Sequence, residues 1–182
     1  MRVGIDARMY GPKQGGLGRY IEQLIKHLEQ IDAQNEYIIF LREENWDQYS
    51  PPPAKEGAGG GGSFKKILAD MPWYGLAEQF KLGKLIKEQK IDLMHFPHWN
   101  VPLFYNKPFI VTVHDILLLH YPTREASALG PLTYWLKNLV FKKVLKHAIK
   151  KAKRILTPSE FTKEDLHKTL GAPLEKISVI YL

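Results

Sequence analysis

Short runs of apolar residues recur along the chain, and within most of them nearly every position is apolar. Continuous apolarity of this kind is typical of strands that are buried on both faces of a parallel sheet. We expect strands over residues 3–6, 37–41, 64–69, 92–95, 109–114, 154–157 and 177–181. Helical spacing of apolar residues predicts helices over residues 17–31, 74–89, 132–151 and 159–170. Strands that alternate with helices predict an α/β fold with a doubly wound, Rossmann-like parallel sheet.

Two of the expected helices indicate which side they bury. The packed face of the first is expected to carry Leu17, Ile21, Leu24, Leu28 and Ile31. The core stripe of the third is expected to contain Phe141, Val144, Leu145, Ala148, Ile149 and Ala152. The lysines that lie off this stripe are Lys142, Lys143, Lys146 and Lys150. The apolar residues on the opposite side of its first turns are Trp135, Leu136, Leu139 and Val140.

Those first turns are apolar nearly all round, so another surface must cover them. The preceding apolar loop, a partner protein and a membrane interface are the candidates, since Trp with flanking Lys is favoured at membrane surfaces. Trp135, Leu139 and the four lysines are therefore predicted membrane or partner contacts. A merely solvated basic face is the alternative for the later turns. The net charge of +7, concentrated in residues 137–154, favours phosphate-bearing partners, but no nucleic-acid-binding module is present.

Composition narrows the class of protein. The 182 residues are 45% hydrophobic, which predicts a single domain over residues 1–182. The absence of cysteine excludes disulfides, thiolate metal sites and a cysteine nucleophile. No signal peptide and no apolar run of roughly 20 residues occurs, so we expect a cytoplasmic protein whose membrane contact, if any, is peripheral. Residues 57–63 read as an engineered Gly/Ser linker, with a natural surface loop as the alternative, and the stop at Leu182 after a strand indicates a fragment.

A glycine-rich loop joins the first strand to the first helix. It contains Gly15, Gly16 and Gly18, which lack a Cβ atom and let the backbone approach a ligand closely. A phosphate or sugar oxygen could then bind the free amides at the helix N-terminus. The alternative is a turn that binds nothing. A nicotinamide site is a weaker hypothesis, because the Gly-x-Gly-x-x-Gly spacing is missing and only Glu43 and Glu44 could supply its acidic residue.

Polar residues follow three further strands, where ligands bind in open α/β sheets. His114 and Asp115 are the predicted catalytic pair: the imidazole can bond a hydroxyl or phosphate, and Asp115 can orient the ring or bind a hydroxyl. Their alternative is a structural role. His98 and Trp99 predict a stacking platform for a sugar ring, with Trp99 packing over the sheet as the alternative. Ser159 and Glu160 predict either a helix cap or ligand contacts. No metal site is expected, because the histidines lack a third ligand.

The Gly-Gly-Leu-Gly loop, the Val-His-Asp strand end and the Pro-Ser-Glu-Phe-Thr-Lys-Glu-Asp-Leu helix start together resemble the N-terminal domain of group 1 glycosyltransferases, which are glycogen-synthase-like and retaining. The resemblance covers nearly the whole chain. It implies one half of a two-domain GT-B enzyme of hexosyl or mannosyl type, with no metal or cofactor. The nucleotide-sugar would bind mainly to a C-terminal domain, and the acceptor to this one.

By that resemblance, Gly15, Gly16 and Gly18 would line the cleft, His114 would reach the transferred sugar, and Asp115, Ser159 and Glu160 would lie nearby. The expected function is acceptor binding for sugar transfer to a lipid-linked or polysaccharide acceptor, at the cytosolic face of the membrane. The C-terminal domain is absent from this sequence, so we expect the chain alone to be inactive. The alternative is a non-catalytic module that binds an anionic membrane or a protein through residues 132–154. Exposed apolar faces also favour self-association.

Overall fold

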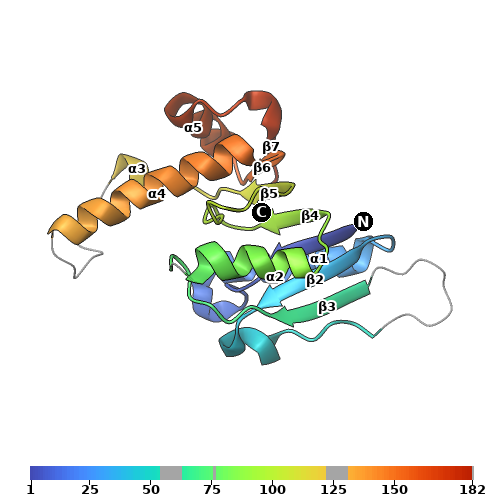
Figure 1. Cartoon of the computed structure of the whole chain (residues 1–182). Coiled ribbons are helices and arrows are strands. Elements are labelled where there is room, and N and C mark those ends of the chain that lie inside the picture. Colours follow the sequence, from blue (N-terminus) through green and yellow to red (C-terminus); the bar gives the residue numbers. More distant parts are fainter. Residues whose placement is uncertain (54–62, 76, 122–130, 182) are drawn as a thin grey trace.

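The computed structural model describes residues 1–53, 63–75, 77–121 and 131–181. In these ranges seven strands pair in parallel in one sheet of order β3-β2-β1-β4-β5-β6-β7 (Figure 1). Their bounds are β1 Arg2–Asp6, β2 Glu36–Leu41, β3 Ser63–Leu68, β4 Leu93–Phe96, β5 Phe109–Thr112, β6 Arg154–Thr157 and β7 Ile177–Val179. All seven expected strands and the doubly wound α/β class are confirmed. The strand order reverses between β1 and β4, and this switch point is where such sheets bind ligands.

The helices lie between the strands, as the periodicity predicted. The α-helices are α1 Gly15–Ile31, α2 Gly83–Glu88, α3 Leu117–His120, α4 Pro131–Lys151 and α5 Glu160–Leu170. A π-helical segment, η3 Glu78–Leu82, runs into α2, and short 3-10 helices are η1 Pro12–Gln14, η2 Glu43–Gln48 and η4 Leu174–Lys176. The expected start at residue 74 is wrong, because Tyr74 has a positive φ of 60° and lies in a turn.

Two hydrophobic clusters fill the two faces of the sheet. Along β2, Tyr37, Ile39 and Leu41 belong to one cluster, while Ile38 and Phe40 belong to the other. This alternation follows from the pleat, which points successive side chains to opposite faces. Helix α1 covers the first face through Ile21 and Ile25, while α2, α4 and α5 contribute to the second. Both faces are therefore covered, which explains the continuous apolar runs.

The packed face of α1 differs in part from the expected one. Its fully buried residues are Gly18, Ile21 and Ile25, with Leu17 and Leu28 partly buried beside them. Ile31 is 76% exposed, because it is the last residue of the helix and lies past the edge of the cluster. The helix also begins at Gly15 rather than at residue 17, since glycines in its first turn hide the start of the apolar period.

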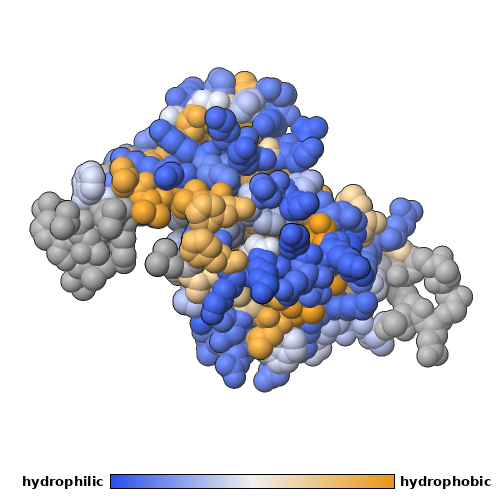
Figure 2. All heavy atoms as spheres, in the orientation of Figure 1, coloured by the Kyte–Doolittle hydropathy of each residue, from blue (hydrophilic) through white to orange (hydrophobic). Residues whose placement is uncertain are grey.

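Helix α4 extends beyond the sheet (Figure 1) and changes character along its length. Its second half packs on the core through Leu145, Ala148 and Ile149, as does Ala152 directly after it, and Val144 is buried as well, which confirms the expected stripe. Its first half exposes Trp135, Leu139 and Val140, at 61%, 51% and 48%. Leu117 and Leu118 of α3 are also exposed, and Figure 2 shows hydrophobic residues gathered along α4. The predicted linker falls almost wholly outside the described residues.

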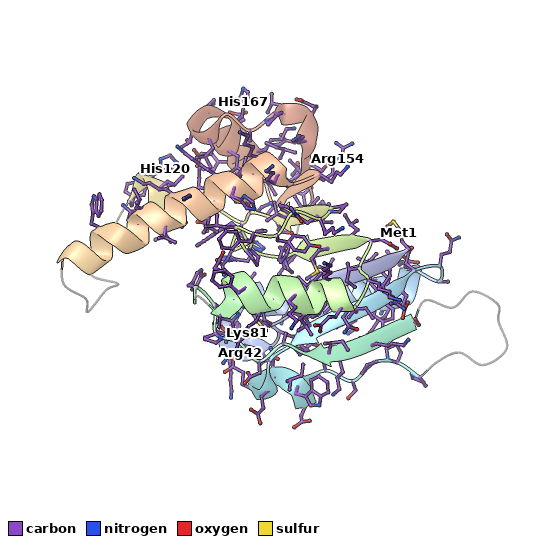
Figure 3. The ribbon with its side chains drawn as sticks, viewed as in Figure 1. Met1, Arg42, Lys81, His120, Arg154 and His167 are labelled. Atoms are coloured by element: carbon purple, nitrogen blue, oxygen red, sulfur yellow. The ribbon has the colours of Figure 1, made fainter. Side chains whose placement is uncertain are left out.

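A polar contact links the third α-helix to the fifth. The Nε2 atom of His120, labelled on α3 in Figure 3, lies 2.8 Å and 2.9 Å from the two carboxylate oxygens of Asp165 on α5. Asp165 also accepts a hydrogen bond from the Thr169 hydroxyl at 2.9 Å. These contacts hold the segment that follows β5 against α5.

Candidate functional site

The carboxyl ends of β1, β4, β5 and β6 meet at one edge of the sheet, because all four strands run in the same direction. The polar residues that follow these strands are Asp6 and Arg8, His98 and Asn100, His114 and Asp115, and Ser159 and Glu160. The start of α1, with its glycines, follows β1 at this same edge. The topology therefore brings the predicted site residues to one edge.

The glycines of the loop have different roles. Gly15 has φ of 59°, a left-handed conformation that side chains rarely adopt, and Gly15 and Gly16 both face open space. Gly18 is buried, and a Cβ atom there would lie 1.9 Å from the carbonyl oxygen of Gly11. Gly18 is thus required for packing of the loop on α1, and its contact with a ligand stays a prediction. Gly15 and Gly16 leave the helix N-terminus accessible to a ligand.

His114 is held by its surroundings in one orientation. Its Nε2 atom lies 3.1 Å from the carbonyl oxygen of Pro97, so this nitrogen donates and Nδ1 of the neutral ring is left as an acceptor. Tyr20 of α1 packs its ring edge-on against the imidazole, with centroids 4.9 Å apart. Burial lowers the pKa of His114, against the opposing effects of the Pro97 bond and of Asp115, so the ring is neutral at pH 7.

Asp115 does not orient the imidazole. It is exposed, and its Oδ1 atom accepts a hydrogen bond from the backbone amide of Leu117 at 3.0 Å, which stabilises the start of α3. The carbonyl of Pro97 takes the orienting position at His114. Binding of a sugar hydroxyl by Asp115 stays a prediction.

A buried polar chain lies behind His114. The Thr112 hydroxyl lies 3.0 Å from the Tyr20 hydroxyl and 2.9 Å from Nε2 of His95. Burial is the main cause that lowers the pKa of His95 to about 4, so this ring stays neutral. The chain ties α1 to β5 and β4, and it fixes Tyr20, which packs on His114.

Trp99 takes the packing position that was the alternative to a sugar platform. It is half-buried, and its ring packs edge-on against Phe141 of α4 at 4.7 Å. His98 and Tyr74 lie on it with centroids at 4.5 Å and 5.6 Å. Burial lowers the pKa of His98 to about 4. Contact of His98 or Trp99 with a sugar stays a prediction.

Ser159 is the N-cap of α5, as its sequence position predicted. Its hydroxyl accepts from the Thr162 amide at 3.1 Å, and Thr162 donates from its own hydroxyl to the carbonyl oxygen of His114 at 3.2 Å. Glu160 is exposed and forms an ion pair with Lys163 at 3.0 Å. The cap thus links the start of α5 to the end of β5, and ligand contacts of Ser159 and Glu160 stay predictions.

Sequence reasoning missed a buried ionic network at the switch point. Arg8 is 1% exposed and donates two hydrogen bonds to Asp6, at 2.7 Å and 2.8 Å, and one to Glu78 at 2.5 Å. Glu78 is fully buried. Its carboxylate accepts hydrogen bonds from the side-chain amide of Asn100 at 2.9 Å and from the backbone amide of Tyr74 at 2.8 Å. Burial alone would lower the pKa of Arg8, but the charges and hydrogen bonds of both carboxylates outweigh it and raise the pKa.

Only part of this network had a signal in the sequence. An Asp-x-Arg pair directly after a buried strand indicates charge at the ligand edge, whereas Glu78 lies 70 residues away in a helix with nothing to mark it. Asn45 was missed as well. Its side-chain amide donates to the carbonyl oxygens of Ala7, Arg8 and Tyr10, at 3.2, 3.0 and 3.3 Å, and so fixes the chain after β1.

The predicted membrane or partner contacts form a separate surface along α4. Trp135, Leu139 and the lysines 142, 143, 146 and 150 are exposed there. Among the described residues, no group of three or more His, Asp or Glu side chains is arranged to hold a metal ion. Across those same ranges, the helices lack the length and apolarity needed to cross a membrane.

Comparison with known proteins identifies the family. The model of Glycosyltransferase Family 4 matches residues 14–182. The O-antigen chain mannosyltransferase RfbU of Salmonella typhimurium is 32% identical over 114 residues, which cover 63% of this chain and 29% of RfbU. The chain thus spans less than a third of this curated relative.

A solved structure is also similar. The match to a glycosyltransferase from Rickettsia africae ESF-5 covers 99% of this chain and 42% of the Rickettsia chain, at a TM-score of 0.48 and 15% identity. The resemblance to a glycosyltransferase N-terminal domain, predicted from three motifs, is confirmed by the family match. This chain belongs to Glycosyltransferase Family 4.

Proposed function

We propose that this chain forms the acceptor-side half of a retaining sugar-transfer site, which moves a sugar from a nucleotide-sugar to a lipid-linked or polysaccharide acceptor. The observation that carries the proposal is the contact between α1 and His114. Tyr20, one turn past the open glycines, packs directly on the imidazole, so the accessible helix N-terminus and His114 belong to one rigid unit. The family match supports sugar transfer as the reaction.

In this proposal His114 binds a hydroxyl group of a sugar through the lone pair of Nδ1. The pKa of the ring is lowered by burial, so the ring stays uncharged and accepts a hydrogen bond at neutral pH. Its Nε2 atom is engaged with the Pro97 carbonyl, which fixes the tautomer. The name of RfbU supports mannose as the transferred sugar.

The leaving nucleoside diphosphate needs positive charge to stabilise it. At the described edge, Arg8 is buried between two carboxylates, so its charge is already neutralised. We therefore propose that a second, donor-binding domain supplies the diphosphate contacts and that this chain alone transfers no sugar. Turnover of any nucleotide-sugar by the purified chain would overturn this part of the proposal.

Replacement of His114 tests the function. In a protein that joins this chain to a donor-binding domain of the family, we expect His114→Ala to lower transfer by about 100-fold, a typical loss for a positioned polar group in a reacting site. The matched control is His27→Gln, because His27 is exposed on α1 and bonds only the carbonyl of Gln23 in its own helix. Equal transfer by both variants would reject a role for His114.

The exposed apolar turns of α4 support contact with a membrane that carries the acceptor. Trp135 and Leu139 are more than half exposed, and exposed lysines follow them along the helix. We expect salt-sensitive sedimentation of the chain with anionic liposomes, weakened by the double change Trp135→Ala/Leu139→Ala. The matched control is Ile31→Ala/Phe161→Ala, at two apolar positions on other helices that are more exposed than Trp135 and Leu139. Lack of binding by the unchanged chain would redirect the search to soluble acceptors.

The same surface supports the second candidate, a module that binds a membrane or protein without taking part in sugar transfer. The two candidates differ in their dependence on His114. Liposome binding that persists in His114→Ala, together with full transfer by that variant, would favour the non-catalytic module.

A further inference from the structure

A small pocket at the switch point has Asp6, Arg8, Trp73, Pro97 and His98 among its lining residues. Its volume of about 10 Å³ is roughly what one water-sized group occupies. Three buried polar atoms of its lining residues have no hydrogen-bond partner: Nη1 of Arg8, Nε1 of Trp73 and Nδ1 of His98. Buried polar groups are nearly always paired, so three unpaired atoms in residues that line one cavity point to a polar group that binds there.

The orphaned atoms define the chemistry of that group. Arg8 and Trp73 can only donate hydrogen bonds, while Nδ1 of the neutral His98 ring accepts in the tautomer protonated at Nε2. A hydroxyl group has one proton to donate and two lone pairs to accept with, so its hydrogen-bonding capacity matches two donors and one acceptor. A phosphate is too large for the cavity, and the carboxylates of Asp6 and Glu78 beside Arg8 would repel it.

The pocket lies next to the residues of the proposed acceptor site. Pro97 lines the pocket, and its carbonyl oxygen accepts the hydrogen bond that orients His114. We propose that the pocket is a subsite for one hydroxyl group of the acceptor sugar, to which Arg8 and Trp73 donate and from which His98 accepts. This inference rests on the proposed function, and it makes Trp73 a binding residue that selects for one hydroxyl of the sugar ring.

The indole N–H of Trp73 offers a direct test by NMR of the ¹⁵N-labelled chain. The sequence has four tryptophans, and Trp73→Phe assigns the Trp73 indole signal by its disappearance. The probes are methyl α-D-mannoside, methyl α-D-glucoside and methyl α-D-galactoside, with inorganic phosphate as the anion control. We expect at least one glycoside to shift the Trp73 signal at millimolar concentration, and phosphate to leave it in place. The monodeoxy form that lacks the bound hydroxyl should abolish the shift.

The affinity for the glycoside, measured from the other NMR signals that shift on titration, gives a second readout. Trp73→Phe keeps an aromatic ring under Arg42, whose guanidinium carbon lies 4.7 Å from the ring centroid, and removes only the donor. Loss of one neutral hydrogen bond should weaken the glycoside roughly 2- to 10-fold. Trp46→Phe is the matched control, because Trp46 also lies under a cation, Lys66 at 4.3 Å, but does not line the pocket. The affinity of the Trp46→Phe variant for the glycoside should not change.

The outcomes separate this inference from the proposed function. A Trp73 signal that no glycoside moves, or that phosphate moves equally, overturns the subsite and leaves the pocket to a structural water. If transfer still depends on His114 in that case, the proposed function stands and only the subsite fails. If glycosides move the Trp73 signal while transfer does not need His114, the pocket binds sugar but the proposed function fails.

Discussion

Gly18 and Gly16 both lie in the first turn and a half of α1, yet alanine should have opposite effects at the two positions. At Gly16 nothing lies within 4 Å of an added Cβ atom. At Gly18 the Cβ atom would lie 1.9 Å from the carbonyl oxygen of Gly11 and 3.0 Å from the Cβ atom of Gln14. The first of these neighbours is backbone, so it cannot rotate away, and the loop that carries the accessible glycines must move.

The size of each effect follows from the contacts. Alanine at Gly16 should raise the free energy of unfolding by about 0.5 kcal/mol, because alanine restricts the unfolded chain and favours helix. Alanine at Gly18 gains the same helix term, but overpacking against Gly11 costs about 1–3 kcal/mol. Because the helix term is common to both variants, their free energies of unfolding should differ by about 1–3 kcal/mol, the cost of the overpacking. That difference corresponds to roughly 2–12 °C in melting temperature for a domain of this size.

Urea unfolding followed by circular dichroism measures both free energies, provided that the m-values agree. The same variants also test the loop as a ligand site. In the joined protein, Gly16→Ala should lower sugar transfer while it keeps stability, since its methyl group enters the open space at the helix N-terminus. Equal stability of Gly16→Ala and Gly18→Ala would refute the packing argument for Gly18.

Two further predictions concern buried polar groups. Glu78→Gln should lower the free energy of unfolding by about 2 kcal/mol, because Arg8 loses a charged partner in the core. Glu160→Gln, at the exposed ion pair with Lys163, should lower it by less than about 1 kcal/mol. Similar losses for the two variants in urea unfolding would contradict this reasoning. Burial lowers the pKa of His95 to about 4, against about 6.5 when unfolded, so the unfolded chain binds more protons between these values. The contribution of His95 to the free energy of unfolding should be full above pH 6.5 and should fall toward pH 4, by up to about 1.4 kcal/mol per pH unit. If the pH dependence of stability has the same slope in His95→Gln, His95 is not its cause.

Local sequence pattern determined the elements of the fold. The apolar runs predicted all seven strands, and periodicity predicted the four longer helical regions, because burial on both faces of a parallel sheet leaves a strong local signal. The residues at which the helices begin were predicted less accurately. The start of α1 at Gly15 and the turn at Tyr74 depend on glycine conformation and positive φ, which apolar periodicity does not report.

The candidate site was determined by sequence only in part. His114 and Ser159 could be placed at strand ends, because parallel strands share one carboxyl edge. Their partners could not be predicted: Tyr20 packs on His114, Glu78 bonds Arg8, and Trp99 packs on Phe141. Each of these contacts joins residues far apart in the chain, and only the order of strands and the path of the helices brings them together. The sequence therefore located the edge of the sheet at which we propose that a sugar binds, and the tertiary structure decided which groups there are paired and which are free.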